Sequence, residues 1–318
     1  MAKAGSDKSE VVSRVPLACA DEMAAVEFLE SLRWGGEPYC LHCGDSNVYA
    51  MTKRGTKERN ARYLWRCRGC GKQFTIRVGT VMEDSAIPLR HWVFAFWAVS
   101  ASKKGVSALQ IKRQTGVTYK SALFMMHRVR WAMNGQAPHP LKGTVEVDET
   151  YVGGKPRMPH KGKKRVPQHS TKKDRKTQVI AMVERNGSVR THVHTDVTED
   201  NLLDIVRGEV SPSATVYTDG YCGYDNVGKH FAGHETVIHT NREYVRGDVH
   251  TNTVEGFFSL LKRGVIGTFH NVSRKHLHRY VSEFEFRWNT RRMDDGARLR
   301  SLVRAADGRR LTYAEQVG

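Results

Sequence analysis

The sequence has no long apolar run and no apolar segment at its N-terminus. The longest apolar stretch, Trp92 to Ala101, is about half of the roughly 20 residues that a membrane-spanning helix needs. Residues Met1 to Val15 are polar and charged, and they lack the apolar centre of a secretory signal peptide. The sequence therefore predicts a soluble, cytoplasmic protein with no membrane partner.

Acidic residues are fewer than basic residues, and the chain has only six cysteines. The chain has 33 Asp and Glu against 51 Lys and Arg, which gives a net charge of +18. Such a surplus favours a polyanionic partner, because each Lys or Arg that neutralises a phosphate releases a condensed counterion. Ribosomal or acidic-membrane partners would explain the charge equally well. The charge therefore indicates a class of partner and no activity.

Four of the six cysteines form two Cys-x-x-Cys pairs, Cys40/Cys43 and Cys67/Cys70, separated by 23 residues. In a reducing compartment this pattern indicates metal rather than disulfides. The spacing predicts a zinc ribbon in which four thiolates complete a closed, structural tetrahedron. A redox dithiol pair is the alternative. The surrounding strands are basic, which favours contact with the DNA backbone or, alternatively, a solvated charged face.

Two helical patterns, 106–115 and 118–133, meet at Gly116-Val117. Two helices joined by a tight turn resemble a helix-turn-helix, whose second helix enters the major groove of DNA. That helix would present Lys120, Arg128 and Arg130 to DNA. A plain helical hairpin fits the same pattern.

Three acidic residues occur where secondary structure can bring them together. Asp148 lies on a strand, 144–150, that alternates β-branched residues with acids, and Asp219 ends a second β-rich run, 214–219. A buried carboxylate is costly unless it is paired, hydrogen-bonded or bound to metal, so acids on apolar strands need a reason. The third acid, Glu255, belongs to a segment with the helical apolar spacing of Val254, Phe257, Phe258 and Leu261.

The polar face of that helix carries Asn252, Glu255, Ser259 and Lys262. Oxygen ligands gathered from two strands and one helix suit hard divalent cations. Two such ions can activate an attacking oxygen and stabilise a leaving oxygen in an in-line phosphoryl displacement.

Several segments of the sequence resemble those of the zinc-ribbon subgroup of bacterial insertion-sequence DDE transposases. They are the ribbon, Val147-Asp148-Glu149-Thr150-Tyr151-Val152-Gly153-Gly154-Lys155, Tyr217-Thr218-Asp219-Gly220-Tyr221 and His250-Thr251-Asn252-Thr253-Val254-Glu255-Gly256. The resemblance implies a ribonuclease H-like core in which Asp148 and Asp219 bind catalytic Mg²⁺ or Mn²⁺. We expect Glu255 to be the third ligand, because an anion holds Mg²⁺ better than the neutral amide of Asn252. Asn252 would be a further ligand or would orient a water.

The same resemblance implies DNA as the partner, both the terminal inverted repeats and the target. Lys262 and Arg263 would contact DNA phosphates, and a homodimer or higher oligomer would hold two DNA ends near the bacterial nucleoid. The segment 155–176 is strongly basic and contains Lys163, Lys164 and Arg165. We expect it to be a loop that orders against nucleic acid, or else an unrelated solvated insert.

Two alternatives remain at this point. The chain could be a zinc-ribbon and helix-turn-helix regulator with an inactive core, or a metal-dependent nuclease that does not join strands.

The predicted architecture is an α+β multidomain protein, and its parts follow the order of the chain. We expect a disordered tail (1–16), a helix with the zinc ribbon (17–80), a helix-turn-helix-like region (81–140), a ribonuclease H-like α/β catalytic domain with a mixed sheet (141–295) and a C-terminal tail (296–318) that closes the core. The run of strands, helix, strand and helix within 141–295 is the ribonuclease H-like order.

Overall fold

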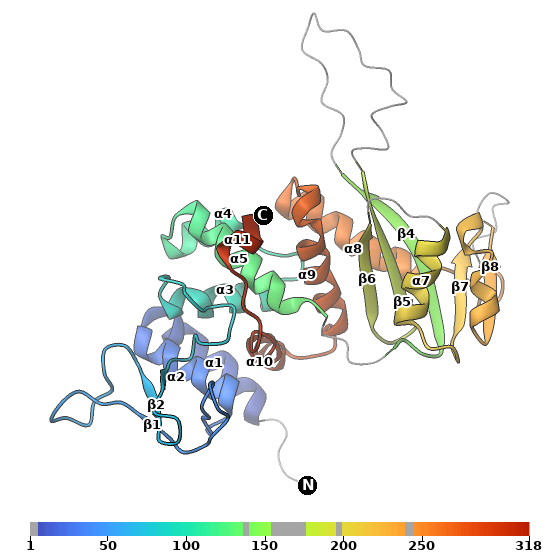
Figure 1. Ribbon diagram of the computed structural model, residues 1–318. Coiled ribbons are helices and arrows are strands. Elements are labelled where there is room, and N and C mark those ends of the chain that lie inside the picture. The colour runs from blue at the N-terminus through green and yellow to red at the C-terminus, as the bar shows by residue number, and fades with distance from the viewer. Residues whose placement is uncertain (1–5, 136–139, 154–175, 195–198, 239–244, 318) are drawn as a thin grey trace, which may run out of the picture. The chain divides into compact units, whose positions relative to one another are not determined.

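The computed structural model describes residues 6–135, 140–153, 176–194, 199–238 and 245–317 (Figure 1). The chain divides into two compact units. One consists of Met1–Met133 together with Arg292–Gly318, and we call it the ribbon unit. The other is Asn134–Arg291, the sheet unit. The predicted basic loop, with Lys163, Lys164 and Arg165, lies outside the described residues.

The ribbon unit is mainly helical. Its helices are α1 (Ser6–Ala20), α2 (Glu22–Trp34), α3 (Leu89–Ala101), α4 (Ala108–Thr115), α5 (Tyr119–Met133), α10 (Asp295–Ala305) and α11 (Tyr313–Val317). The expectation of a disordered segment through residue 16 is wrong, because α1 begins at Ser6 and buries Val11 and Val15, which are one helical turn apart. Asp21 begins α2 by accepting a hydrogen bond from the backbone N–H of Ala24 at 2.7 Å.

The C-terminal segment belongs to the ribbon unit, and the expectation that it closes the catalytic core is wrong. Helix α10 packs against α1, α2, α3 and α5. Its apolar side chains Leu299, Leu302 and Val303 recur at helical spacing and are buried. Arg304 also donates from Nε to the carbonyl oxygen of Leu32 at 3.1 Å.

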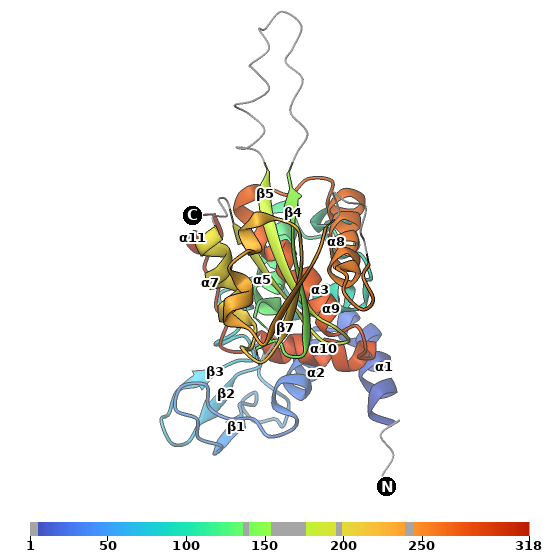
Figure 2. The ribbon, with the colours of Figure 1, turned by 90° about the vertical axis from the view of Figure 1, so that its right-hand side faces the viewer.

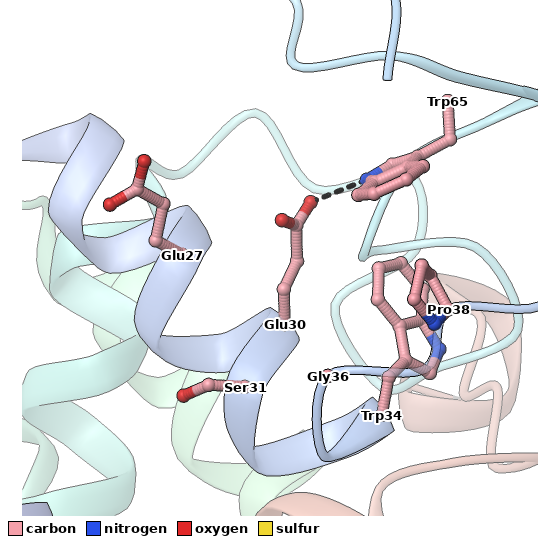
Figure 3. A pocket seen from close by; sticks show the side chains of 7 residues that line it. All are labelled: Glu27, Glu30, Ser31, Trp34, Gly36, Pro38 and Trp65. Atoms are coloured by element: carbon pink, nitrogen blue, oxygen red, sulfur yellow. Dashed lines mark hydrogen bonds between the residues drawn. The ribbon is translucent and has the colours of Figure 1, made fainter. Parts of the chain in front are cut away.

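The zinc-ribbon region forms a small antiparallel sheet of β1 (Val48–Ala50), β2 (Trp65–Cys67) and β3 (Gln73–Phe74). Between this region and α2 lies a cavity of about 250 Å³ lined by Glu27, Glu30, Ser31, Trp34, Gly36, Pro38 and Trp65 (Figure 3). Glu30 accepts a hydrogen bond from Trp65 Nε1 at 2.7 Å and pairs with Arg59 at 2.7 Å. The cavity is thus separate from the sheet unit, which contains the predicted catalytic acids.

Arg128 and Arg130 are interior residues of the ribbon unit, which corrects the expectation that they contact DNA. Arg128 is 4% exposed and donates to the carbonyl oxygens of Val81 and Glu83, at 2.9 and 2.6 Å. Arg130 is 1% exposed. The C-terminal half of α5 is buried, so only its first turn, which includes Lys120, is open to a partner.

The sheet unit is built on a five-stranded mixed sheet in the order β6-β5-β4-β7-β8. Its strands are β4 (Thr144–Val152), β5 (Thr177–Glu184), β6 (Val189–His194), β7 (Thr215–Asp219) and β8 (Gly233–Val237). β4, β5 and β6 are antiparallel neighbours, and β7 runs parallel to both β4 and β8. The hairpin between β5 and β6 turns at Asn186, whose φ of 61° is left-handed, as the Asn-Gly pair predicts.

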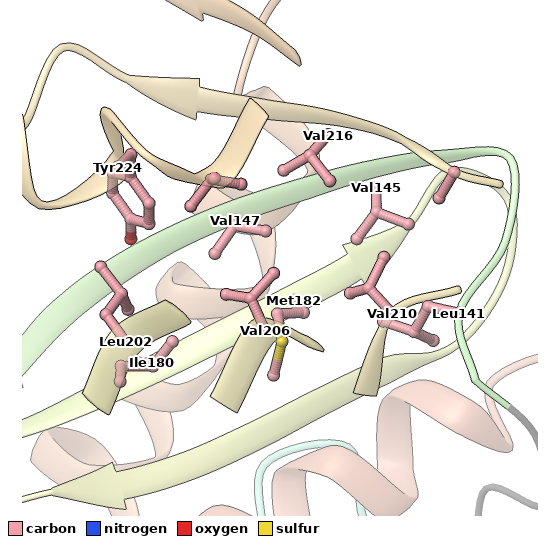
Figure 4. Packing of buried hydrophobic residues seen from close by; sticks show 12 residues of the cluster. Leu141, Val145, Val147, Ile180, Met182, Leu202, Val206, Val210, Val216 and Tyr224 are labelled. Carbon is pink, nitrogen blue, oxygen red and sulfur yellow. The ribbon is translucent and has the colours of Figure 1, made fainter. Parts of the chain in front are cut away.

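Helices cover both faces of this sheet (Figure 2). α7 (Glu199–Glu209) packs on one face over a cluster that includes Val145, Val147, Val206 and Tyr224 (Figure 4). α8 (Asn252–Gly264) and α9 (Leu277–Asn289) pack on the other face. The α8–α9 approach is close at Gly264, where a Cβ would lie 2.0 Å from the ring of Phe284. The C-terminal end of α8 is therefore packed tightly against α9.

Candidate functional site

Asp148 and Asp219 lie at the same level on neighbouring parallel strands. The register pairs Glu146 of β4 with Tyr217 of β7, and each aspartate is two residues further along its strand. Side chains alternate between the two faces of a sheet with a period of two residues. Both aspartates therefore point to the face that α8 covers.

α8 adds the third set of polar side chains to this face. Asn252 is the first residue of the helix, Glu255 follows one turn later, and both side chains are exposed. The carboxylate of Glu255 turns back towards the helix start, where its Oε1 lies 3.5 Å from the hydroxyl of Thr251. Asn252 and Glu255 thus share the end of α8 that begins over the sheet.

The charges of these acids act on one another. Burial, together with the negative charges of Glu149, Asp219 and Glu255, raises the pKa of Asp148 to about 7, against the lowering effect of a hydrogen bond from the Glu149 N–H. That bond, from N to Asp148 Oδ1, is 2.7 Å long. Asp148 is therefore a carboxyl whose ionised form lacks a compensating positive charge, which is the electrostatic condition that a divalent cation relieves.

Glu149 points to the opposite face of β4. Its Oε2 accepts a hydrogen bond of 2.7 Å from the hydroxyl of Tyr224, which belongs to the cluster under α7. The strand alternation predicts this direction. Glu149 therefore contributes charge near Asp148 without sharing the face of Asp148 and Asp219.

Glu146 belongs to this site although no role was predicted for it. It lies on the same face of β4 as Asp148, and it is fully buried. Its carboxylate accepts hydrogen bonds from the backbone N–H groups of Thr253 and Val254, from the Thr253 hydroxyl and from Arg185. The only signal in the sequence was its alternation with Asp148, because its partners on α8, Thr253 and Val254, are more than a hundred residues away along the chain.

The predicted DNA-contacting residues that the structure describes fall into three groups. Lys262 and Arg263 are exposed near the end of α8, and Lys262 lies two turns beyond Glu255 on the same face. Lys120 is exposed at the start of α5. Arg128 and Arg130 are buried, as described above.

The four predicted cysteine ligands lie together in the ribbon unit. The Sγ atoms of Cys40, Cys43, Cys67 and Cys70 are all within 4.8 Å of one another. Among them, the Sγ of Cys40 lies 3.6 Å from that of Cys70, and the Sγ of Cys43 lies 3.7 Å from that of Cys67. Four sulfurs at a Zn–S distance of about 2.3 Å would be separated by about 3.8 Å in a tetrahedron, so the set fits zinc.

Local backbone geometry builds this cysteine site. Gly44 and Gly71 directly follow the second cysteine of each pair and have φ of 77° and 72°, which favours glycine. Although burial raises it, the pKa of Cys40 falls to about 7 because the backbone N–H groups of His42 and Cys43 donate to its sulfur. Although the backbone N–H of Asp45 lowers it, hydrogen bonding with Cys40 and burial raise the pKa of Cys43 to about 12. The thiols of this cluster therefore differ in how readily they release the proton that zinc binding displaces.

Within the described part of the chain, only these cysteines bring three or more His, Cys, Asp or Glu ligand atoms close enough to hold an ion as they stand. The carboxylates of the sheet unit are within electrostatic reach but are more widely spaced. Among the same residues, no helix has the length and apolarity required to cross a membrane.

Comparison with known proteins gives two domain matches. Residues 140–289 match the ISXO2-like transposase domain, and residues 20–73 match the transposase zinc-ribbon domain. The first of these ranges contains every carboxylate of the sheet unit discussed above, and the second contains all four cysteine ligands. The cysteine geometry and the ribbon match together support a structural zinc site.

Two relatives extend this result. The chain is 31% identical over 298 residues to an uncharacterized protein in transposable element ISH50 of Halobacterium salinarum, which covers 90% of this chain and 97% of the relative. It is also 31% identical over 106 residues to an uncharacterized transposase-like protein of Haemophilus influenzae, which covers 32% of this chain and 80% of the relative. The similarity to the first therefore spans both units.

Proposed function

The chain belongs to the family of insertion-sequence transposases with an ISXO2-like transposase domain, and on this premise we propose that it cuts element ends and joins them to target DNA by two-metal-ion phosphoryl transfer. The observation that carries this proposal is the register of β4 and β7, in which Asp148 and Asp219 are at one level and face α8. The charge of Glu255 acts on Asp148 from that helix.

The proposal includes a ribonuclease H-like core. In its support, β4, β5 and β6 form an antiparallel meander, α7 crosses one face, and β7 returns parallel to β4 beside it. The first and fourth strands are then neighbours. This neighbourhood is what allows acids that are 71 residues apart in the sequence to share one site.

In this proposal the residues of the sheet unit hold and orient the reacting groups. Asp148, Asp219 and Glu255 supply the oxygen ligands that Mg²⁺ or Mn²⁺ prefers. Ions bound there would stabilise the entering and leaving oxygens of an in-line displacement. Asn252, at the exposed start of α8, orients water or a phosphate oxygen through its amide.

The DNA would lie along the exposed face of α8. Lys262 is seven residues beyond Glu255, a rise of about 10 Å along the helix, so it meets a phosphate beyond the one being cut. Arg263 beside it and Lys120 on α5 contribute further phosphate contacts. Because cutting and joining involve two element ends, we expect a dimer or higher oligomer on DNA. Sizing of the complex with a terminal-repeat duplex measures this.

A magnesium-dependent assay on DNA that carries the element's inverted repeats tests the proposed function. A transposase cuts at the repeat ends and joins the freed 3′ ends to target DNA. Cutting without joining would indicate a nuclease, and binding without cutting would indicate a regulator. The Asp219→Asn variant is the control, because it is expected to lose both reactions and keep DNA binding.

A further inference from the structure

We propose that Glu146 is a positioning residue that fixes the start of α8, and with it Asn252 and Glu255, against Asp148. This inference rests on the proposed function, which it deepens by assigning the device that assembles the carboxylates. Glu146 itself binds neither metal nor DNA in this scheme.

The first observation is the way in which α8 begins. The first N–H groups of a helix have no partner within the helix, and the preceding side chain usually caps them. Thr251, the residue at the cap position, makes no such hydrogen bond. Instead Glu146 Oε2 accepts from the N–H of Thr253 at 2.7 Å and from that of Val254 at 3.1 Å. A strand carboxylate 107 residues earlier therefore caps the helix, where its negative charge also suits the helix dipole.

The second observation is that the capping carboxylate is itself held in place. Glu146 Oε1 accepts from the Thr253 hydroxyl at 2.7 Å and from Arg185 Nε at 2.8 Å. His250 Nδ1 lies 3.3 Å away from the same oxygen. Arg185 also donates to the carbonyl oxygen of His250 at 3.2 Å, and its guanidinium lies over the ring of Tyr217 on β7. One network thus joins β4, β5, β7 and the segment that leads into α8.

The position of this network determines the geometry of the site. Glu146 and Asp148 are one strand repeat apart on the same face of β4, about 7 Å. Glu255 lies only about 1.5 to 3 Å along the helix from the residues that Glu146 holds, Thr253 and Val254. A shift of the helix start therefore moves Glu255 relative to Asp148 by a similar distance. Since these carboxylates are too widely spaced to hold an ion without rotating, their ligand set depends on where α8 begins.

A purely structural ion pair would explain the burial of Glu146 but not a specific effect on metal binding. The experiment uses the full chain loaded with zinc and measures Mn²⁺ affinity from the electron paramagnetic resonance of free Mn²⁺. In Glu146→Gln an amide NH₂ group replaces one carboxylate oxygen. A donor then faces the N–H and O–H donors from which that oxygen accepted hydrogen bonds. We expect the dissociation constant for Mn²⁺ to rise about 10- to 100-fold, as for other residues that orient metal ligands. The variant Asp148→Asn lacks a proposed metal ligand, so it gives the Mn²⁺ signal expected when the carboxylate site is not functional.

Glu283→Gln is the matched control. Glu283 is also fully buried, and it pairs with Arg287 at 2.7 Å within α9. Its loss is expected to lower the unfolding temperature and leave the Mn²⁺ affinity unchanged. Thr253→Val removes one donor to Glu146 and should weaken Mn²⁺ binding in the same direction by less. It decides the question if Glu146→Gln does not fold.

The outcomes are distinct. Folded Glu146→Gln with wild-type Mn²⁺ affinity overturns the inference alone, as does wild-type affinity in Thr253→Val when Glu146→Gln is unfolded. Weakening of equal size in Glu283→Gln also overturns it, because the effect would then follow from stability. If the wild-type chain binds no more Mn²⁺ than Asp148→Asn does, both this inference and the proposed metal site are wrong.

Discussion

The cysteine site and the carboxylate site are built in opposite ways. Each cysteine pair occupies one short turn, and the ligand atoms are already within 4.8 Å of one another. The carboxylates of the proposed metal site come from two strands and a helix separated by 71 and 36 residues. In our proposal their arrangement depends on strand register and on Glu146, which accepts hydrogen bonds from the first N–H groups of α8. The first site requires only its own turns, whereas the second requires that the whole sheet unit be folded. Zinc should therefore support folding, and a catalytic ion should bind to a fold that already exists.

The largest expected effect is the loss of zinc from the ribbon, which should leave the carboxylate site of the sheet unit intact. Cys67→Ser should lose zinc and unfold the ribbon, because structural zinc contributes about 10 to 16 kcal/mol of apparent binding free energy in zinc-finger peptides. The sheet unit should keep its Mn²⁺ binding. Metal analysis and thermal unfolding measure both effects. Cys19→Ser is the matched control, since Cys19 is outside the cluster. Retention of zinc by Cys67→Ser would contradict the cysteine site.

The next prediction concerns the third ligand of the carboxylate site and distinguishes Glu255 from Asn252. Glu255→Gln should lower the rate of DNA cleavage by at least about a thousandfold, or about 4 kcal/mol, because it removes an anionic ligand. Asn252→Ala should lose less. Single-turnover cleavage at saturating Mn²⁺ measures both. Near-normal cleavage by Glu255→Gln together with an inactive Asn252→Ala would reverse the assignment of the third ligand.

A third prediction concerns pH. The pKa of Asp148 is about 7 in the folded chain and the ordinary value is 3.8. Between these values the folded chain binds the additional proton, so its stability falls as pH rises from about 4 to about 7 and is then constant. The metal-free wild type should be more stable at pH 5 than at pH 8 by an amount on the order of a few kcal/mol, and Asp148→Asn should lack this dependence.

Urea unfolding at several pH values measures this effect. Mg²⁺ should reduce the dependence in the wild type and have no effect in Asp148→Asn. An identical pH profile for the two proteins would show that Asp148 is not the carboxyl with the raised pKa.

The smallest effects distinguish surface cations from interior ones. Lys262→Gln should weaken DNA binding and reduce the slope of log affinity against log salt by about 1, as the loss of one phosphate contact does. Arg128→Gln should leave that slope unchanged and lower the free energy of unfolding by about 1 to 3 kcal/mol, because buried carbonyl groups lose their donor. If Arg128→Gln alters the slope of log affinity against log salt, Arg128 contacts DNA after all.

The parts of the fold that were predictable depend on local patterns. The Cys-x-x-Cys pairs, the Asn186 turn and the apolar spacing of α8 each involve residues that are close in sequence. The strand of Asp219 was recognisable from its β-branched residues. β8 was not predicted, because Gly233–Val237 contains His and Glu and has no apolar alternation. Its pairing with β7 determines its structure, and that pairing is not encoded within the segment.

The errors have a shared cause in long-range contacts. The segment around Val11 is polar on average and becomes helical because Val11 and Val15 pack inside the ribbon unit. Arg128 was expected on a DNA surface because arginine is usually exposed, yet distant carbonyl groups pair with it. The role of Glu146 was missed for the same reason, since Glu146 is on β4 and the N–H groups that it caps are on α8, more than a hundred residues later.

Diffraction from crystals of the full chain soaked in Mn²⁺ tests the central claim most directly. The anomalous signal of manganese should show ions bound by Asp148 and Asp219, with Glu255 as a ligand or hydrogen-bonded to one. The account is contradicted if manganese at a concentration that supports DNA cleavage binds elsewhere, or if these three carboxylates remain apart when it is bound.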